Sequence, residues 1–205
     1  TCDWSSDVCS SDLDLAYGPR PRGEAYSAPK PCGARGRMVE RGCLLIADIT
    51  GYTGFLNESE LEHAQDSLTS LLNVLIGHTK PPLAISRLEG DAVISYALQR
   101  SFTQGQVLVD MIEATYVSFR QALERMVLNT TCTCNACRNI ANLDLKFFVH
   151  HGEFMRQALG GHDELVGRDV NIVHRIAKNT IAATTGIRAY TAYTRQAIDG
   201  LGLDA

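Results

Sequence analysis

The sequence predicts an α+β fold with a ferredoxin-like core, in which a split βαβ arrangement builds one antiparallel sheet. Short apolar runs with β-branched residues are separated by longer segments whose apolar residues recur at helical spacing. The expected order is strand, helix, strand, strand, helix, strand, followed by a further helix and strand. The chain has 205 residues, which is enough for one domain with a sizeable core or for one domain and a tail.

Charge and composition exclude several classes of protein. The chain has 19 Lys and Arg against 23 Asp and Glu, so its net charge of −4 argues against a nucleic-acid partner held by a broad basic surface. No apolar stretch approaches the ~20 residues of a membrane span, and the N-terminus lacks the pattern of a signal peptide. We therefore expect a cytoplasmic protein without a membrane partner. Its seven cysteines would stay reduced rather than form a disulfide framework.

The first 37 residues are expected to lie outside the domain. Residues 3–13, "DWSSDVCSSDL", have no helical or strand periodicity and resemble the translation of a sequencing adapter, so residues 1–13 are interpreted as adapter-like. Residues 18–37 are rich in Pro, Gly and Arg and have few large apolar side chains. We interpret residues 1–37 as a non-native or disordered leader, a genuine disordered tail being the alternative, and residues 38–205 as the domain.

The first half of the domain reads as a strand, a helix and a hairpin. Residues 43–49 form an apolar run typical of a buried strand. Residues 57–79 are predicted to form an amphipathic helix that ends before Pro81. Its apolar positions are Leu61, Ala64, Leu68, Leu71, Leu72 and Leu75. Residues 83–88 and 92–98 read as two strands joined by a turn at Glu89-Gly90-Asp91.

The second half begins with a long helix predicted over residues 104–127. Its apolar positions include Val107, Met111, Ala114, Val117 and Phe119. A cysteine-containing segment at about 129–141 interrupts the pattern. The remaining elements are a strand at 143–154, its return at 155–161, a helix at 167–183, a short strand at 185–191 and a final helix at 192–201.

Two aspartates are expected to meet at one end of this sheet. Asp48 ends the first strand, and Asp91 lies at the tip of the hairpin. In a ferredoxin-like sheet the first strand lies beside the strand that leaves the hairpin, so the two carboxylates can converge. Paired carboxylates suit Mg²⁺ or Mn²⁺. Taken alone, Asp48 would more often be a helix cap, and Gly90-Asp91 only a turn.

Four motifs together resemble the class III nucleotidyl cyclases, over roughly residues 43–200. They are "ADITGYTGF" at 47–55, "LEGDAVISYA" at 88–97, "FFVHHGEF" at 147–154 and "GRDVNIVHR" at 167–175, and they follow the family's order at near-family spacing. The Cys-x-Cys-x-x-Cys insert suggests a little-characterised bacterial branch. Because the family normally continues past the last helix, the resemblance also implies that this chain is truncated at its C-terminus.

The resemblance implies a role for each matching residue. Asp48 and Asp91 match the two metal-binding aspartates, Asn171 the asparagine that orients the ribose, and Arg175 the arginine that stabilises charge on the phosphates. The backbone before and within the next helical turn is a reasonable phosphate cradle. The residues of this cradle are Ile49, Gly51, Tyr52, Thr53, Gly54 and Phe55.

Base selection is where this sequence departs from the family. Many adenylyl cyclases have a Lys four residues before the second metal Asp and an Asp three residues before the helix Gly. Here these positions hold Arg87 and Glu164. Arg87 can donate to adenine N1 and Glu164 can accept from the 6-amino group, whereas guanine would want an acceptor in place of Arg87. Arginine is bulkier than lysine and binds as a planar fork.

The resemblance therefore implies conversion of ATP to cyclic AMP and pyrophosphate at a homodimer interface, with Mg²⁺ or Mn²⁺. In the family, metal activates the ribose 3′-hydroxyl, and a second metal and the arginine offset charge on the leaving pyrophosphate. The alternative is a catalytically silent module that keeps the fold for nucleotide sensing or dimerisation. A third reading is a zinc-dependent interaction module centred on the cysteines.

Three thiols within six residues, Cys132, Cys134 and Cys137, can bind zinc if a fourth ligand comes from elsewhere. His150, His151 or a thiol of a partner chain are the candidates for that ligand, and a reduced surface loop is the alternative. The two histidines alternate on a strand and should point to opposite faces. We expect one to be packed and one exposed, and neither to be catalytic.

Overall fold

The computed structural model describes residues 38–101, 104–159 and 162–203. Residues 1–37, interpreted above as a leader, lie outside the described residues. The described residues belong to one compact unit. In the described part, no helix is both long enough and apolar enough to cross a membrane.

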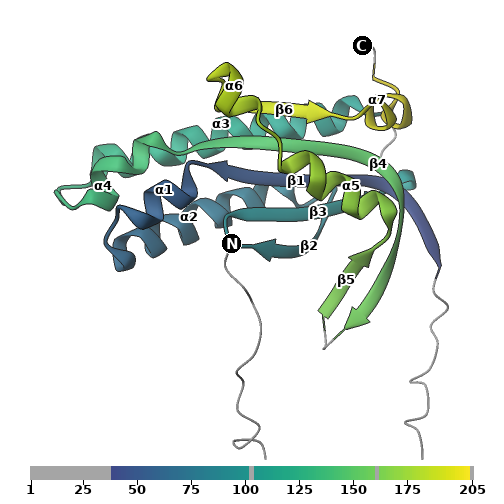
Figure 1. The fold of residues 1–205 in the computed structure, drawn as a ribbon, viewed down its shortest axis with the longest axis horizontal. Coiled ribbons are helices and arrows are strands. Elements are labelled where there is room, and N and C mark those ends of the chain that lie inside the picture. The colour runs from purple at the N-terminus through teal and green to yellow at the C-terminus, as the bar shows by residue number, and fades with distance from the viewer. Residues whose placement is uncertain (1–37, 102–103, 160–161, 204–205) are drawn as a thin grey trace, which may run out of the picture. The chain divides into compact units, whose positions relative to one another are not determined.

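Within the described residues one sheet of six strands forms the centre of the domain (Figure 1). The strands are β1 (Val39–Thr50), β2 (Ala84–Glu89), β3 (Ala92–Leu98), β4 (Asp144–Leu159), β5 (His162–Val166) and β6 (Tyr190–Tyr193). Their order is β2-β3-β1-β4-β5, all antiparallel, and β6 runs parallel to β4. The predicted α+β class and the adjacency of the first strand to the strand leaving the hairpin are confirmed.

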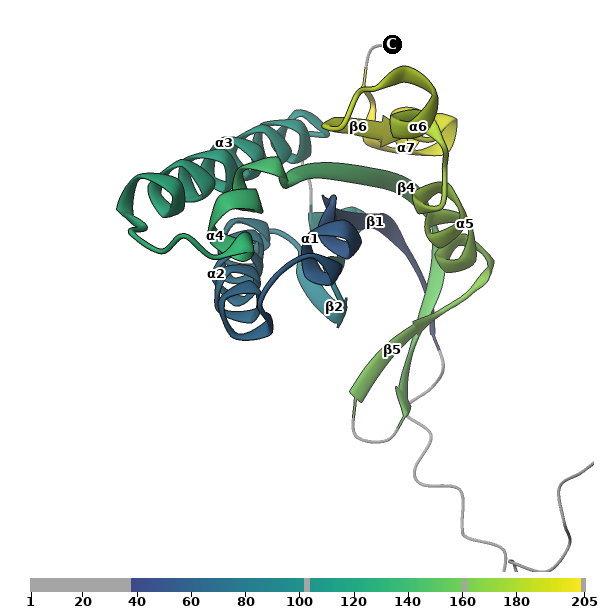
Figure 2. The same cartoon turned by 60° about the vertical axis from the view of Figure 1, so that its left-hand side comes forward.

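Helices cover both faces of the sheet (Figure 2). They are α1 (Tyr52–Asn57), α2 (Leu61–Thr79), α3 (Gln106–Asn129), α4 (Asn135–Asn139), α5 (Arg168–Ala177), α6 (Ile181–Thr185) and α7 (Arg195–Leu201), with 3₁₀ turns at Gln99–Ser101 and Ile140–Asn142. The long helices α2 and α3 pack on one face, and α5 packs on the other. The first three sequence motifs, at 47–55, 88–97 and 147–154, thereby lie on a sheet that has helices packed on both of its faces.

The apolar run of β1 explains why helices pack on both faces of the sheet. Cys43 and Leu45 point into the larger core with α2 and α3, and Leu44 and Ile46 point into the smaller core with α5. All four are at most 2% exposed. A strand buried on both faces reads as a continuous apolar run rather than an alternation, and burying each such aliphatic side chain stabilises the fold by about 1.5–3 kcal/mol.

Strand β4 is longer than predicted. Residues 155–159 were expected to begin a returning strand, but they continue β4, and the return is β5. The reason is the length of β1, whose first residue, Val39, still pairs with Met155. The long hairpin of β4 and β5 is visible in both views of the fold (Figure 1 and Figure 2).

The helix predicted over 167–183 is instead two helices, α5 and α6. Asn179 separates them: its Nδ2 donates to the carbonyl of Ile176 at 2.8 Å, and its Oδ1 accepts from the amide of Ile181 at 2.8 Å. A side chain that bonds the backbone in this way competes with helical hydrogen bonds. The strand predicted at 185–191 consequently starts later, at Tyr190.

The apolar stripe of α3 is also shifted from the predicted one. Val107, Ala114 and Val117 are exposed. The positions that face α2 and the sheet are Leu108, Ile112, Thr115, Phe119, Ala122 and Leu123. Thr115 can be buried because its hydroxyl donates to the carbonyl of Met111 at 2.7 Å. The helix predicted over 57–79 likewise starts later, at Leu61, after the short α1.

Candidate nucleotide and metal sites

Asp48 and Asp91 lie at the same end of the sheet. Asp48 is opposite Ala92 in the register of β1 and β3, and the amide of Ile49 donates to the carbonyl of Asp91 at 3.3 Å. Lys146 on the neighbouring β4 places its Nζ 3.3 Å from Oδ2 of Asp48. The sequence did not single out Lys146, whose only signal is a cationic residue before the apolar residues Phe147 and Phe148, because its pairing with Asp48 depends on the register of β1 and β4.

The two carboxylates share a site in which Lys146 is the nearest cationic side chain. Burial, together with the charge of Asp48, raises the pKa of Asp91 from 3.8 to about 6. Burial also raises the pKa of Asp48, and the ammonium of Lys146 partly opposes that rise. Burial and the charge of Asp48 thus disfavour the ionised form of Asp91, and Lys146 does not cancel their effect. A divalent cation held by oxygen ligands would fit this pair.

The segment after Asp48 forms a tight turn into α1. Gly51 precedes the helix with φ of 91°, in the left-handed region that favours glycine, and its carbonyl accepts from the amide of Phe55 at 2.9 Å. Phe55 is buried and anchors the turn to the larger core. The amides of Tyr52, Thr53 and Gly54 belong to the first helical turn, where no preceding helical carbonyl is available to them. These are the cradle residues that the sequence predicted.

Arg87 and Glu164, the residues expected to select the base, contact each other. They come from β2 and β5 and lie far apart in sequence, yet Nη1 of Arg87 donates to Oε2 of Glu164 at 2.6 Å. Arg87 also pairs with Glu89. A register shift in β2 between Ile85 and Arg87 marks a local irregularity of the kind that re-aims side chains. Curling of the sheet brings its two outer strands, β2 and β5, together at this pair.

Asn171 and Arg175 are exposed on α5, one turn apart. Within the described residues, no hydrogen bond or ion pair joins either side chain to Asp48 or Asp91. The first turn of α5 is fixed to β4 by Asp169, whose Oδ2 accepts from the amide of Glu153 at 2.6 Å. One chain therefore presents the aspartate pair and the asparagine–arginine pair separately.

His150 and His151 point to opposite faces, as predicted, but the expectation that one is exposed is wrong. They are 1% and 4% exposed. His150 faces α5, where its Nε2 lies 3.5 Å from Oδ1 of Asp169, and its Nδ1 lies 2.9 Å from Oγ1 of Thr194. His151 packs against Gly200 of α7, and burial lowers its pKa. Both are buried because a different helix covers each face of β4.

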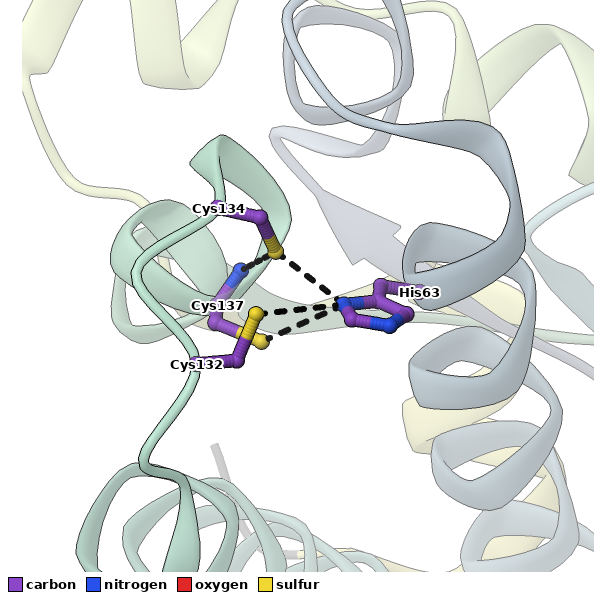
Figure 3. Close-up of side chains that lie close together, drawn as sticks. All are labelled: His63, Cys132, Cys134 and Cys137. Atoms are coloured by element: carbon purple, nitrogen blue, oxygen red, sulfur yellow. Dashed lines mark hydrogen bonds between the residues drawn. The ribbon is translucent and has the colours of Figure 1, made fainter.

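A second constellation joins the cysteine segment to α2 (Figure 3). Nδ1 of His63 lies 3.1 Å from Sγ of Cys134, 3.5 Å from that of Cys132 and 3.8 Å from that of Cys137. All four ligand atoms lie within 4.8 Å of one another, and they could hold a metal ion. The candidate ligands His150 and His151 are wrong, since both are buried in the sheet. His63 gave no sequence signal because it is a single exposed histidine on a helix.

Comparison with solved structures places the chain in a known fold. The crystal structure of the adenylyl cyclase CyaB from P. aeruginosa superposes with a TM-score of 0.63 at 17% identity, covering 82% of this chain and 83% of that one. A class III adenylyl cyclase-like ATP-binding protein from Pseudomonas aeruginosa superposes with a TM-score of 0.55 at 18% identity, covering 79% of this chain and 35% of that one. The chain therefore has the fold of class III cyclase domains.

Sequence comparison gives the family. The uncharacterized protein Rv2561/Rv2562 of Mycobacterium tuberculosis (strain ATCC 25618 / H37Rv) is 31% identical over 114 residues, which cover 56% of this chain and 52% of that protein. This chain thus spans about half the length of that relative. A family model described as "Protein of unknown function (DUF2652)" matches residues 68–185. Because this match covers more than half of the chain, the protein belongs to the DUF2652 family, on a class III cyclase fold.

Proposed function

We propose that this chain is the catalytic domain of a nucleotidyl cyclase that converts ATP to 3′,5′-cyclic AMP and pyrophosphate. The observation that carries the proposal is the aspartate pair at the ends of β1 and β3, where burial and the charge of Asp48 raise the pKa of Asp91 to about 6. A carboxylate pair with such a strongly raised pKa is typical of a functional site rather than of a structural turn. The fold shared with adenylyl cyclase domains supports the same reaction class.

Asp48 and Asp91 would hold Mg²⁺ or Mn²⁺ with their carboxylate oxygens. When bound, such a cation supplies positive charge that lowers the pKa of a ribose hydroxyl and offsets charge on phosphate oxygens. Burial raises the pKa of Asp48, and Lys146, whose Nζ lies 3.3 Å from Oδ2, opposes that rise and so favours the ionised form that would bind the cation. The amides of the turn from Gly51 to Gly54 would contact phosphate oxygens.

In the proposed reaction the 3′-oxygen of the ribose forms a bond to the α-phosphorus, and the bond from that phosphorus to the bridging oxygen of the β-phosphate breaks. The hydroxyl proton is lost to solvent, and pyrophosphate leaves with the electron pair of the broken bond. Arg175 would donate to the phosphate oxygens where negative charge develops, and Asn171 would position the ribose. These two side chains would be Asn171 and Arg175 of the partner subunit, since those of the same chain make no bond to its aspartates.

The contact of Arg87 with Glu164 supports adenine as the base. A guanidinium beside a carboxylate presents a donor next to an acceptor, which matches N1 and the 6-amino group of adenine. The carboxylates of Glu164 and Glu89 also fix the plane of the guanidinium of Arg87, so its hydrogen-bond donors would already be oriented when the base binds. Guanine would present a donor to Arg87, which has no acceptor to offer.

The alternative is a catalytically silent module that binds a nucleotide. It is favoured by the ion pairs that already engage Asp48 and Arg87 in the isolated chain. A class III cyclase-like protein of this fold that is described as ATP-binding also supports this alternative. The two proposals share the nucleotide and differ in whether pyrophosphate is released.

The test is turnover by the full-length protein with ATP and Mn²⁺, with cyclic AMP and pyrophosphate measured by mass spectrometry. Cyclic AMP should form, excess GTP should compete poorly, and Asp91→Asn should abolish product. Asp110→Asn is the matched control, because Asp110 is an exposed aspartate on α3 away from the site. Metal-dependent ATP binding without product would select the silent module, and no metal-dependent ATP binding in the folded protein would reject both.

A further inference from the structure

We propose that His63, Cys132, Cys134 and Cys137 bind one zinc ion in a closed, structural four-ligand site. Histidine and cysteine in this ratio are ligands that zinc takes in structural sites. The ligands come from two segments far apart in sequence, the first turn of α2 and the segment between α3 and β4. This inference is independent of the nucleotide chemistry proposed above.

The spacing of the ligand atoms matches a single tetrahedral ion. A Zn–S bond of about 2.3 Å and a Zn–N bond of about 2.0–2.1 Å, at the tetrahedral angle, place nitrogen and sulfur about 3.6 Å apart. The three distances from Nδ1 of His63 to the cysteine sulfurs are 3.1, 3.5 and 3.8 Å, which bracket this value. A cluster with two or more irons would spread its ligands over several metal atoms, whereas here all four atoms lie within 4.8 Å of one another.

The surroundings hold the cysteines in place. The amide of Cys137 donates to Sγ of Cys134 at 3.4 Å, a hydrogen bond that orients this ligand. The amide of Ala136 donates to Oε2 of Glu60 at 3.1 Å, so the residue before α2 binds the start of α4. Ala136 is completely buried in the larger core. The cysteine segment is therefore packed against the domain rather than loose on its surface.

The charge of the ligand set favours a divalent cation and a structural role. Three thiolates and a neutral imidazole carry three negative charges, which Zn²⁺ reduces to one. With four protein ligands the tetrahedral shell is full, so no position remains for substrate or water. The ion would act as a cross-link between α2 and the cysteine segment, and its binding free energy would add to the stability of the fold.

The experiment is elemental analysis of the full-length protein purified without chelator, together with replacement of zinc by Co²⁺. One zinc per chain is expected, and Co²⁺ should give the intense ligand-field and thiolate charge-transfer bands of a tetrahedral site. His63→Ala and Cys134→Ser should lose the ion on dialysis. His78→Ala is the matched control, because it removes another exposed histidine from the same helix, and it should retain the ion.

A rescue variant separates ligation from folding. Nδ1 is the ring nitrogen nearer the backbone, so His63→Cys should place a sulfur close to the same point, retain zinc and strengthen the charge-transfer bands. Chelator should lower the melting temperature of the wild type but not that of metal-free His63→Ala, with circular dichroism showing that the variant is folded. Wild-type protein that binds neither zinc nor Co²⁺, stoichiometric iron, or full zinc retention by His63→Ala would each overturn the proposal.

Discussion

At the residue scale, Asp91 shows how the candidate site opposes the stability of the fold. Its carboxyl has a pKa of about 6 in the folded chain and an ordinary value of 3.8 when unfolded. Between these values the folded chain binds more protons than the unfolded chain, so the free energy of unfolding falls as pH rises from about 4 to about 6. Above pH 6 the folded chain carries the full unfavourable effect of burying the charged Asp91 carboxylate and of placing it beside Asp48.

Asp91→Asn should therefore raise the free energy of unfolding at pH 7.5 and change it little near pH 4. After allowance for solvent screening of this partly exposed group, the gain is about 1 kcal/mol. Urea unfolding at several pH values measures the effect, and Asp110→Asn serves as the control with no such pH dependence. Equal effects of Asp91→Asn at both pH values would show that burial and the charge of Asp48 do not set this pKa.

At the element scale, the placement of α5 depends on one close approach to β4. Gly152 leaves room for the carboxyl of Asp169, and a Cβ atom at position 152 would overlap that carboxyl. Asp169 binds the amide of Glu153 and lies beside His150, so the start of the helix is held at this point. The exposed residues Asn171 and Arg175 lie further along the same helix, and their position depends on this contact.

Gly152→Ala should lower the free energy of unfolding by about 1–3 kcal/mol, as overpacking of a close contact does. It should also displace the first turn of α5, which amide NMR shifts of that helix would report. Gly77→Ala is the control: no atom lies within 4 Å of the added Cβ, and alanine in a helix should stabilise by up to about 1 kcal/mol. If Gly152→Ala unfolds like the wild type, the contact with Asp169 does not position the helix.

At the scale of the whole molecule, the chain separates the two halves of the proposed site. Asp48 and Asp91 lie at the sheet end, and Asn171 and Arg175 are exposed on α5, with no bond between the pairs in the described residues. Two chains related by a two-fold axis would complete each other's sites, because such an interface uses the same surfaces twice. The proposed enzyme is then inactive as a monomer.

Mixing two inactive variants tests the shared site. The Asp91→Ala homodimer and the Arg175→Ala homodimer should both be inactive, because each has two damaged sites. After subunit exchange, half of the dimers are heterodimers, in which one site carries both changes and the other carries neither, so about a quarter of wild-type activity should return. The control is a mixture of Asp91→Ala with Asp91→Ala/Arg175→Ala, which should remain inactive because every site lacks Asp91. A mixture of the two single variants that exchanges subunits and remains inactive contradicts a shared site.

The sequence by itself determined the class of the fold and the meeting of Asp48 with Asp91. The apolar run of β1 and the turn at Gly90-Asp91 are local signals, and antiparallel pairing of neighbouring strands is enough to bring the two carboxylates to one edge. The spacing of the motifs also indicated α5 and the residues it carries. These features could be predicted because each depends on periodicity, on a short segment or on the strand order of the ferredoxin-like fold.

Only the tertiary structure decided the features that depend on distant elements. The contact of Arg87 with Glu164 requires the two outer strands to curl together, and the burial of both His150 and His151 requires a helix on each face of β4. The partner of the cysteines is His63, which lies near them only because the cysteine segment packs on α2. Periodicity records which side of an element is apolar, but not which other element will cover it, so long-range partners of polar side chains are decided by packing alone.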